Sequence, residues 1–286
     1  MRNLVLGVDI GGSHITTALV DLSLGQLLRE TIKRKALNSL AVSEEVINSW
    51  VDAIEEGFNG YAGPKRIGIA MPGPFDYQEG ISYIKGLQKY DSLYGINVKV
   101  ALANKLGIKS DAILFENDAA CFLQGEIFAG AAKGFRKSIG FTLGTGFGSA
   151  IGMHMLAQDA EFWNRPFLTG IAEDYFSTKW FLKRYEELSG KFVANVQELV
   201  RQYSTCHLVK QVFHEFSHHL SDFSEQIFSL YEPDVIVIGG NISRASDLFL
   251  EQLITHFKNL NKELVIRASL LGEESAIIGG ASLWTR

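Results

Sequence analysis

The stretch LVLGVDIGGSHITTALVD, residues 4–21, contains two apolar runs joined by a short glycine-rich turn. This pattern predicts a strand, a tight turn and a second strand. Two interpretations of the turn are open at this point. Gly11 and Gly12 can supply the unusual backbone angles of a hairpin, or they can leave backbone N–H groups accessible to a phosphate.

A second stretch repeats this design, because KSIGFTLGTGFGSAIGM, residues 137–153, again places a glycine-rich turn between two apolar runs. The repetition suggests a duplicated architecture in which each half of the chain contributes one hairpin turn to a shared cleft. Gly144, Gly146 and Gly148 do not match the dinucleotide-binding fingerprint, because Ser149 stands at its last position and a strand is predicted to follow. The sequence therefore argues against a Rossmann-type site.

The composition indicates a globular protein with small-molecule partners. At 286 residues the chain is long enough for two domains, and 47% hydrophobic with 21% charged residues is typical of globular proteins. A net charge of -5 without a long basic run argues against nucleic acid or an anionic membrane as partner. Cys121 and Cys206 are the only cysteines, which is typical of a reducing compartment. Asp9 interrupts the first apolar run too early for a signal peptide, so we expect a cytoplasmic protein.

Other apolar strands end in turn residues, and such strand ends are where ligands bind in α/β folds. The segments concerned are KRIGIAMPGPFD (65–76), DAILFENDAACFLQGE (111–126) and PDVIVIGGNIS (233–243). We also predict a third strand over 26–35, an amphipathic helix over 40–58 and a terminal helix that contains Gly279 and Gly280. Close packing alone would explain glycines inside that helix.

The segment HEFSH, residues 214–218, matches the metalloprotease pattern of two histidines four residues apart with a glutamate between them. At helical spacing, His214 and His218 lie on the side opposite Phe216, which belongs to the apolar stripe of the predicted helix. This placement favours a solvated helix surface over a zinc protease. His14, in the first turn, can lie near a ligand or be solvated.

Five motifs in order resemble the ROK family of sugar kinases and related regulators. They are GVDIGGSHI (7–15), MPGPFD (71–76), ENDAACFLQGE (116–126), TLGTGFGSAIG (142–152) and VIVIGGNIS (235–243). The resemblance covers nearly the whole chain. It implies an α/β fold of the two-domain actin-like ATPase (ribonuclease H-like) type, shared with hexokinase and heat-shock chaperones, with the ligand cleft between the domains. The expected domains are 1–117 and 118–271, and a C-terminal helix at about 272–286 is expected to pack back on the first.

The resemblance resolves the opening question in favour of phosphate, and implies ATP and Mg²⁺ as the cofactors. Backbone groups of both glycine turns can converge on a polyphosphate because no side chains block the approach. Asp9 would repel phosphate unless Mg²⁺ stood between them, so it is expected to orient the water shell of the metal. The residues expected to bind the nucleotide are Gly11, Gly12, Ser13, His14, Gly144, Thr145 and Gly146, with Gly239, Gly240 and Asn241 on the adenosine side.

The family places its catalytic base in the pair Asn117 and Asp118. A sugar hydroxyl is a poor nucleophile at neutral pH, and a carboxylate can accept its proton during attack on the γ-phosphoryl group. We therefore expect Asp118 to be the general base. Asn117 is expected to orient sugar hydroxyls, and the Gly73 turn to approach the ring. The alternative is that this pair only caps the following helix.

The sequence departs from the family where the sugar is recognised. Family members usually carry a glutamate, glycine and histidine segment before a cysteine-rich zinc loop. Here Trp163 and Asn164 follow Glu161, and the absence of cysteines between 121 and 206 excludes the structural zinc of the family. Glu161, Asn164 and Glu173 are the residues expected to contact the sugar, and the altered segment leaves activity on common hexoses in question.

The leading hypothesis is thus ATP-dependent phosphorylation of a hexose or amino sugar, with the 6-hydroxyl as the common choice of the family. The alternative is a non-catalytic ROK protein that senses a sugar or nucleotide, or regulates. Regulators of the family carry a helix-turn-helix segment before the first phosphate turn, and only residues 1–3 precede the first strand here, so direct DNA binding is not expected. Family habit suggests a homodimer.

Overall fold

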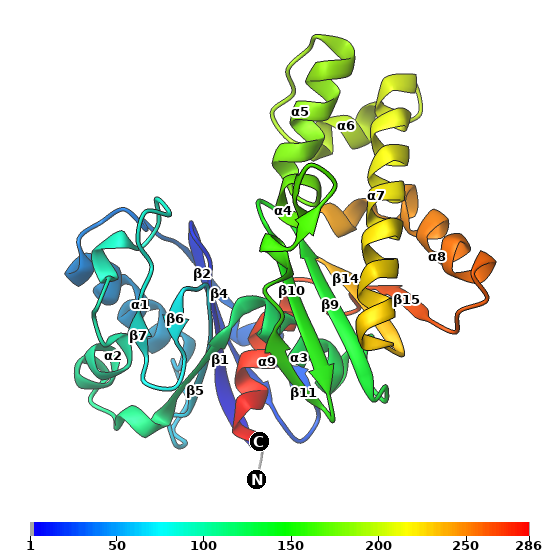
Figure 1. Cartoon of the computed structure of the whole chain (residues 1–286). Coiled ribbons are helices and arrows are strands. Elements are labelled where there is room, and N and C mark those ends of the chain that lie inside the picture. Colours follow the sequence, from blue (N-terminus) through cyan, green and yellow to red (C-terminus); the bar gives the residue numbers. More distant parts are fainter. Residues whose placement is uncertain (1–2, 286) are drawn as a thin grey trace. The chain divides into compact units, whose positions relative to one another are not determined.

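The computed structural model describes residues 3–285, which fold into two compact α/β units (Figure 1). Unit 1 combines Met1–Gly130 with Glu273–Arg286, and unit 2 comprises Ala131–Gly272. The sequence-based boundary lies after Asn117, whereas in the structure the helix that starts at Asp118 packs within unit 1. Its partner in that packing is the C-terminal helix, which also belongs to unit 1.

Unit 1 is built on a mixed sheet with the strand order β3-β2-β1-β5-β8, and β4 also pairs with β2. β1 and β2 form the antiparallel hairpin predicted over residues 4–21, while β5 runs parallel to β1 and β8 parallel to β5. The strands are β1 (Leu4–Ile10), β2 (His14–Asp21), β3 (Gln26–Leu27), β4 (Lys33–Ala36), β5 (Ile67–Met71), β6 (Phe75–Asp76), β7 (Ile81–Ser82) and β8 (Ile113–Asn117). The helices are α1 (Ser43–Gly57), α2 (Val98–Leu106), α3 (Asp118–Ala129) and α9 (Glu274–Ser282).

Helices cover both faces of this sheet because successive side chains of a strand point to opposite sides. Leu6 and Val8 of β1 belong to a core that also contains the buried residues of α1 and α2. Gly7 faces the other way, where a Cβ would lie 2.2 Å from the Ile277 carbonyl oxygen of α9. Figure 1 shows the two layers, with α1 and α2 on one side and α3 and α9 on the other.

The predicted third strand, residues 26–35, is wrong as a single element. The structure breaks it into β3 and β4, with a turn of 3₁₀ helix between them. Thr31 causes the break, because its hydroxyl accepts a hydrogen bond from the Leu19 N–H at 2.9 Å and donates one to the Leu28 carbonyl at 2.6 Å. A threonine hydroxyl can replace a backbone partner in this way and divert the chain from the ladder.

The C-terminal helix α9 packs on α3 through glycines. A Cβ on Gly279 would lie 1.8 Å from the Cys121 carbonyl oxygen, and one on Gly125 would lie 2.1 Å from that of Ser275. The two helix backbones therefore touch directly, which only glycine permits. Close packing accounts for the glycine at 279 inside the predicted terminal helix, and no ligand is needed to explain it.

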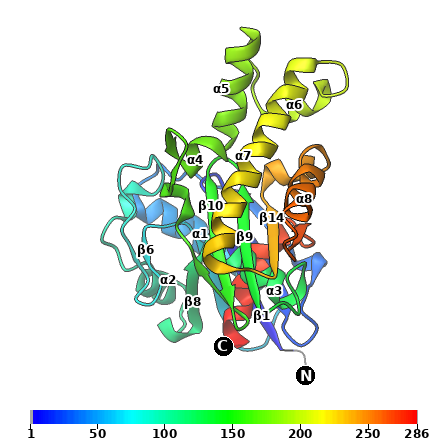
Figure 2. The same cartoon turned by 45° about the vertical axis from the view of Figure 1, so that its right-hand side comes forward.

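Unit 2 repeats the mixed-sheet design with the strand order β11-β10-β9-β14-β15. Its strands are β9 (Lys137–Leu143), β10 (Phe147–Met153), β11 (Leu156–Asp159), β12 (Pro166–Phe167), β13 (Gly170–Ile171), β14 (Val235–Gly239) and β15 (Val265–Ala268). Its helices are α4 (Ala172–Tyr175), α5 (Thr178–Ser189), α6 (Val196–Gln202), α7 (His207–Tyr231) and α8 (Leu250–Asn259). Figure 2 shows the long helix α7 lying along β9 and β10.

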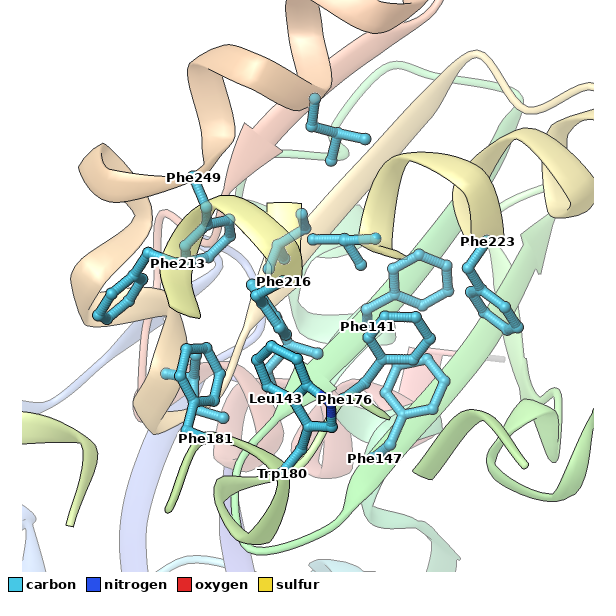
Figure 3. Packing of buried hydrophobic residues seen from close by; sticks show 14 of the residues in the cluster. Phe141, Leu143, Phe147, Phe176, Trp180, Phe181, Phe213, Phe216, Phe223 and Phe249 are labelled. Carbon is cyan, nitrogen blue, oxygen red and sulfur yellow. The ribbon is translucent and has the colours of Figure 1, made fainter. Parts of the chain in front are cut away.

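An aromatic cluster joins α7 to the sheet of unit 2 (Figure 3). Phe223 of α7 lies 6.0 Å from Phe141 of β9 and 5.7 Å from Phe147 of β10, measured between ring centroids. Phe176, which follows α4, lies 5.0 Å from the same ring. This core is separate from that of unit 1.

Within residues 3–285 no helix is both long and apolar enough to cross a lipid bilayer.

Candidate functional site

The turn between β1 and β2 is closed by one hydrogen bond, in which the Gly11 N–H donates to the His14 carbonyl at 2.9 Å. Neither Gly11 nor Gly12 has a positive φ, so the interpretation that they supply unusual backbone angles is wrong. Among residues 3–285, a Cβ on Gly11 would meet only the His14 oxygen at 3.4 Å, and one on Gly12 only Lys89 Cδ at 3.9 Å. Neither backbone strain nor severe crowding therefore requires these glycines. Gly12 leaves a stretch of exposed backbone without a side chain over it, whereas Gly11 is half-buried and its N–H is already engaged by the His14 carbonyl.

Tyr90 stabilises this turn. Its hydroxyl donates to the Gly11 carbonyl at 2.5 Å, and the ring of the buried Trp50 meets the tyrosine ring edge-on at a centroid distance of 5.2 Å. Burial raises the pKa of the Tyr90 hydroxyl above its ordinary value, which keeps the proton available for donation. On the other side of the turn, the Leu37 N–H donates to the Ser13 carbonyl at 2.7 Å. The turn is thus held in one conformation.

Asp118 occupies the first position of α3, and Asn117 caps that helix. The Asn117 side-chain oxygen accepts from the Ala120 N–H at 3.0 Å, so the helix-cap interpretation of this residue is confirmed. Its amide nitrogen donates to the Tyr77 hydroxyl at 3.4 Å, and that hydroxyl donates to the Met71 carbonyl at 3.1 Å. Asn117 is therefore oriented by the end of β5 as well as by its own helix.

The Asp118 carboxylate accepts a hydrogen bond from the Ala119 N–H at 2.8 Å through Oδ1. Solvent reaches this side chain, yet the surrounding protein removes much of its hydration and raises its pKa. The positive charge of Lys89 is the largest opposing influence, followed by the backbone hydrogen bond from Ala119. Asp118 is thus an exposed carboxylate at the start of α3, within electrostatic range of Lys89.

Asp9, near the end of β1, lies within electrostatic range of Asp118. Burial raises the pKa of Asp9 to about 7, and the negative charge of Asp118 adds to the shift. Arg34 opposes it, but this guanidinium is also paired with Glu273 at 3.1 Å. Strand register explains the placement, because Asp9 pairs with Thr16 and Thr16 with Arg34 across three neighbouring strands. Two carboxylates therefore share one region of unit 1.

Gly73 follows β5 in unit 1, where a Cβ would lie 3.1 Å from the Tyr77 hydroxyl. The same hydroxyl accepts the hydrogen bond of Asn117. The structure therefore brings Gly73, Asn117 and, next in the chain, Asp118 to one edge of this sheet.

Two glycine turns meet at one edge of the sheet in unit 2. β9 and β14 are parallel neighbours, so the turns that follow them, 144–146 and 239–241, lie side by side. Gly240 has a φ of 83°, and its Cβ would lie 2.4 Å from the Leu143 oxygen, so the fold itself requires this glycine. Gly144 has no described atom within 4 Å of a Cβ and no positive φ. The Gly144 carbonyl accepts two hydrogen bonds from Thr178 at the start of α5, one from the N–H at 2.7 Å and one from the hydroxyl at 2.9 Å.

The carboxylate of Glu173 lies against the first of these turns. Its Oε2 accepts from the Phe147 N–H at 3.0 Å and would lie 2.7 Å from a Cβ on Gly146. Glu173 and Thr145 also line a polar cavity of about 700 Å³ in unit 2. Glu161 and Asn164 lie outside this cavity, and both are exposed. The structure thus brings Glu173 to the glycine turn, whereas Glu161 and Asn164 are not among the residues that line this cavity.

The sequence profile of the ROK family matches residues 5–158 and 168–286. The chain belongs to the ROK family. The stretch the profile leaves out, 159–167, contains Glu161 and Asn164, so the departure noted in the sequence coincides with a departure from the family pattern. The three glycine turns, Asp118 and Glu173 lie within the matched parts.

Known ROK proteins resemble the chain over nearly its whole length. The glucokinase of Thermotoga maritima is 23% identical over 98% of this chain and 96% of its own. The N-acetyl-D-glucosamine kinase of Mannheimia succiniciproducens is 24% identical over 98% and 99%. The ROK glucokinase of Streptomyces griseus, solved with glucose and AMPPNP, superimposes with a TM-score of 0.80 at 20% identity, covering 98% of this chain and 99% of that one. The protein therefore has the two-domain hexokinase-like α/β fold of ROK proteins, with two mixed sheets.

The HEFSH segment lies on the solvated surface of α7, as predicted. His214 and His218 are exposed, their Nε2 atoms lie 3.1 Å apart, and the Gln252 amide of α8 contacts both rings at 3.2 Å. Glu215 instead points toward α5, where Arg184 binds it through two hydrogen bonds of 2.6 and 3.0 Å. Within residues 3–285, no group of three or more His, Cys, Asp or Glu side chains is placed to hold a metal ion.

Three further residues of this ROK chain were not predicted from its sequence, namely Tyr77, Lys89 and Tyr90. All three lie between β5 and α2, in a segment that contains the two-residue strands β6 and β7 and a turn of 3₁₀ helix but no longer stretch with strand or helix periodicity. The one available signal is a tyrosine directly after a lysine in the stretch KGLQKY, residues 85–90. Their roles depend on contacts with Asn117, Gly12 and Gly11, which lie far away in the chain.

Proposed function

We propose that the protein is an ATP-dependent sugar kinase that transfers the γ-phosphoryl group to the 6-hydroxyl of a hexose or amino sugar, in the class of glucose or N-acetylglucosamine. Membership of the ROK family and the kinases named among its relatives support this proposal. The observation that carries it is the pairing, within unit 1, of an open glycine turn with a carboxylate at the start of α3. The glycine turn suits a phosphate group, and the carboxylate can accept a proton.

Asp118 would act as the general base. As the sugar oxygen attacks the γ-phosphorus, the new O–P bond forms, the bond to the β-phosphate oxygen breaks, and the hydroxyl proton passes to the Asp118 carboxylate. The Ala119 N–H occupies only one acceptor position of this exposed carboxylate, which leaves others for the proton. Asn117 and the Gly73 turn, which meet at the Tyr77 hydroxyl, would position the sugar.

The nucleotide would be bound by backbone groups of the glycine turns. In unit 1, Gly12 and Ser13 present exposed N–H groups, and His14 beside them is exposed as well. In unit 2, the Gly144 N–H donates to the Gly146 carbonyl at 3.0 Å, so the N–H groups that would bind a phosphate are those of Thr145 and Gly146, to which Gly144 leaves the approach open. The turn of residues 239–241 suits the adenosine side.

Asp9 fits a magnesium ion held through water. It offers hard carboxylate oxygens, and its pKa of about 7 reflects a charge that the surrounding protein does not fully compensate. Bound with ATP, Mg²⁺ would neutralise phosphate charge.

The test is ADP release from the purified protein with Mg²⁺ and ATP across hexoses, amino sugars and N-acetylated sugars. The Asp118→Asn variant runs beside the wild type. We expect sugar-dependent release that falls by about 10² to 10⁴ in the variant, with nucleotide binding retained. Turnover that is unchanged in Asp118→Asn would reject the assignment of the base.

A second candidate is a non-catalytic ROK protein that senses a sugar or nucleotide. The observations that favour it are the unmatched stretch 159–167 and the Glu173 carboxylate, which already accepts a backbone hydrogen bond from Phe147. On this hypothesis no sugar releases ADP, although ATP still raises the melting temperature of the protein.

A further inference from the structure

Lys89 lies in a segment that is anchored to the glycine turn of unit 1. The next residue is Tyr90. Its hydroxyl donates a hydrogen bond to the Gly11 carbonyl, and its N–H donates one to the Ser39 carbonyl at 2.7 Å. Tyr90 also has a φ of 57°, a conformation that fixes the direction of the chain on either side. The backbone of Lys89 is therefore held beside the turn by its neighbour.

The side chain of Lys89 lies beside the turn. Its Cδ lies 3.9 Å from the position of a Cβ on Gly12, and its charge acts on the Asp118 carboxyl. The residue is half-buried, and among residues 3–285 its ammonium group makes no hydrogen bond and no ion pair within 4.0 Å. A cation held in this way, without a close partner, contributes little to folding. Its position between an open backbone turn and a carboxylate calls for an anionic ligand.

We propose that Lys89 binds the terminal phosphoryl group of the nucleotide, the group that is transferred. This inference rests on the proposed kinase function, because that group must lie between the glycine turn and the hydroxyl held at Asp118. Its three oxygens carry charge through the transfer, and an ammonium group offers three donors and a full positive charge to them. A nucleoside diphosphate lacks that group, so Lys89 should distinguish triphosphate from diphosphate.

Calorimetric titration of the full chain with Mg²⁺-AMPPNP and Mg²⁺-ADP tests this proposal. In Lys89→Ala we expect AMPPNP to bind about 10- to 100-fold more weakly than in the wild type, while ADP changes by less than about 3-fold. Lys89→Arg should keep most of the AMPPNP affinity. The matched control is Lys85→Ala, in the same segment, whose exposed ammonium lies 4.9 Å from the Tyr94 ring centroid and should not affect either nucleotide.

Equal weakening of both nucleotides in Lys89→Ala, or no weakening of AMPPNP, would overturn the proposal, because either result removes the link to the terminal phosphoryl group. A wild type that binds AMPPNP but releases no ADP with any sugar would count against the kinase function alone, and the affinity ratio would still decide the role of Lys89. A wild type that binds neither nucleotide would overturn both.

Discussion

At the scale of single residues, the chemistry of unit 1 depends on two acids in a region with few compensating charges. The pKa of Asp9 is raised to about 7 by burial and then by Asp118, whereas in an unfolded chain it would titrate near 3.8. The folded protein therefore holds a proton on Asp9 that the unfolded chain has lost over most of this range. Ionised Asp9 is unfavourable for folding, which is the usual cost of a functional acid.

Replacing Asp9 by Asn should therefore stabilise the protein at alkaline pH and impair its magnesium-dependent nucleotide binding. The raised pKa means that the destabilisation by Asp9 is complete above pH 7 and fades as the pH falls toward 4. At pH 8, without Mg²⁺, we expect a gain of about 1 to 4 kcal/mol in the free energy of unfolding. Urea denaturation at pH 8 and pH 5 measures it. A gain that is equal at both pH values would show that Asp9 is not the titrating group.

Asp118 sets a second pH dependence, that of turnover. Because desolvation raises its pKa, the carboxylate needed to accept a proton is lost at higher pH than an ordinary value of 3.8 would imply. The acidic limb of the kcat profile should therefore lie above that value. Lys89 lowers the pKa of Asp118, so Lys89→Met should move this limb to higher pH. A profile with an unmoved limb in the variant would separate Asp118 from the group that titrates.

At the scale of elements, glycines serve two purposes that a substitution can separate. Gly144→Ala should leave the free energy of unfolding within about 0.5 kcal/mol, because no described atom lies within 4 Å of the new Cβ. Gly279→Ala should cost about 3 kcal/mol or more, because its Cβ would overlap the Cys121 carbonyl of α3. Urea midpoints and AMPPNP affinity measure the two effects. For AMPPNP affinity we expect the opposite, with the larger loss in Gly144→Ala. If Gly279→Ala caused the larger loss in both stability and affinity, these roles would be contradicted.

The sequence predicted the elements that depend on local pattern. The hairpin over residues 4–21 and the helix over 40–58 follow from spacing of apolar residues, which the folded chain preserves as β1, β2 and α1. It could not predict that Thr31 would break the third strand, since the partners of that hydroxyl belong to the completed sheet. The role of Lys89 could not be predicted for the same reason, because it depends on Gly12 and Asp118, which only the fold brings near.

At the scale of the whole molecule, each unit has its own core, but only unit 2 is continuous in the chain. Unit 1 takes its last helix from the C-terminus, and α9 covers the face of β1 and β5 opposite α1. Ile277, Ile278 and Leu283 are buried there. At about 1.5 to 3 kcal/mol for each large side chain, their burial is comparable to the whole stability of a typical domain.

A fragment of residues 131–272 should therefore unfold cooperatively on its own, whereas residues 1–130 should not. Without α9, the glycine-lined face of the sheet meets water and the α3 surface around Gly125 loses its partner. Because Gly125 touches Ser275, a short glycine-serine linker can join 130 to 273, and that fusion should recover a single sigmoidal transition. Circular dichroism during urea titration distinguishes the three chains. If residues 1–130 alone unfolded at the same midpoint as the fusion, α9 would be a covering segment whose burial adds nothing to the stability of unit 1.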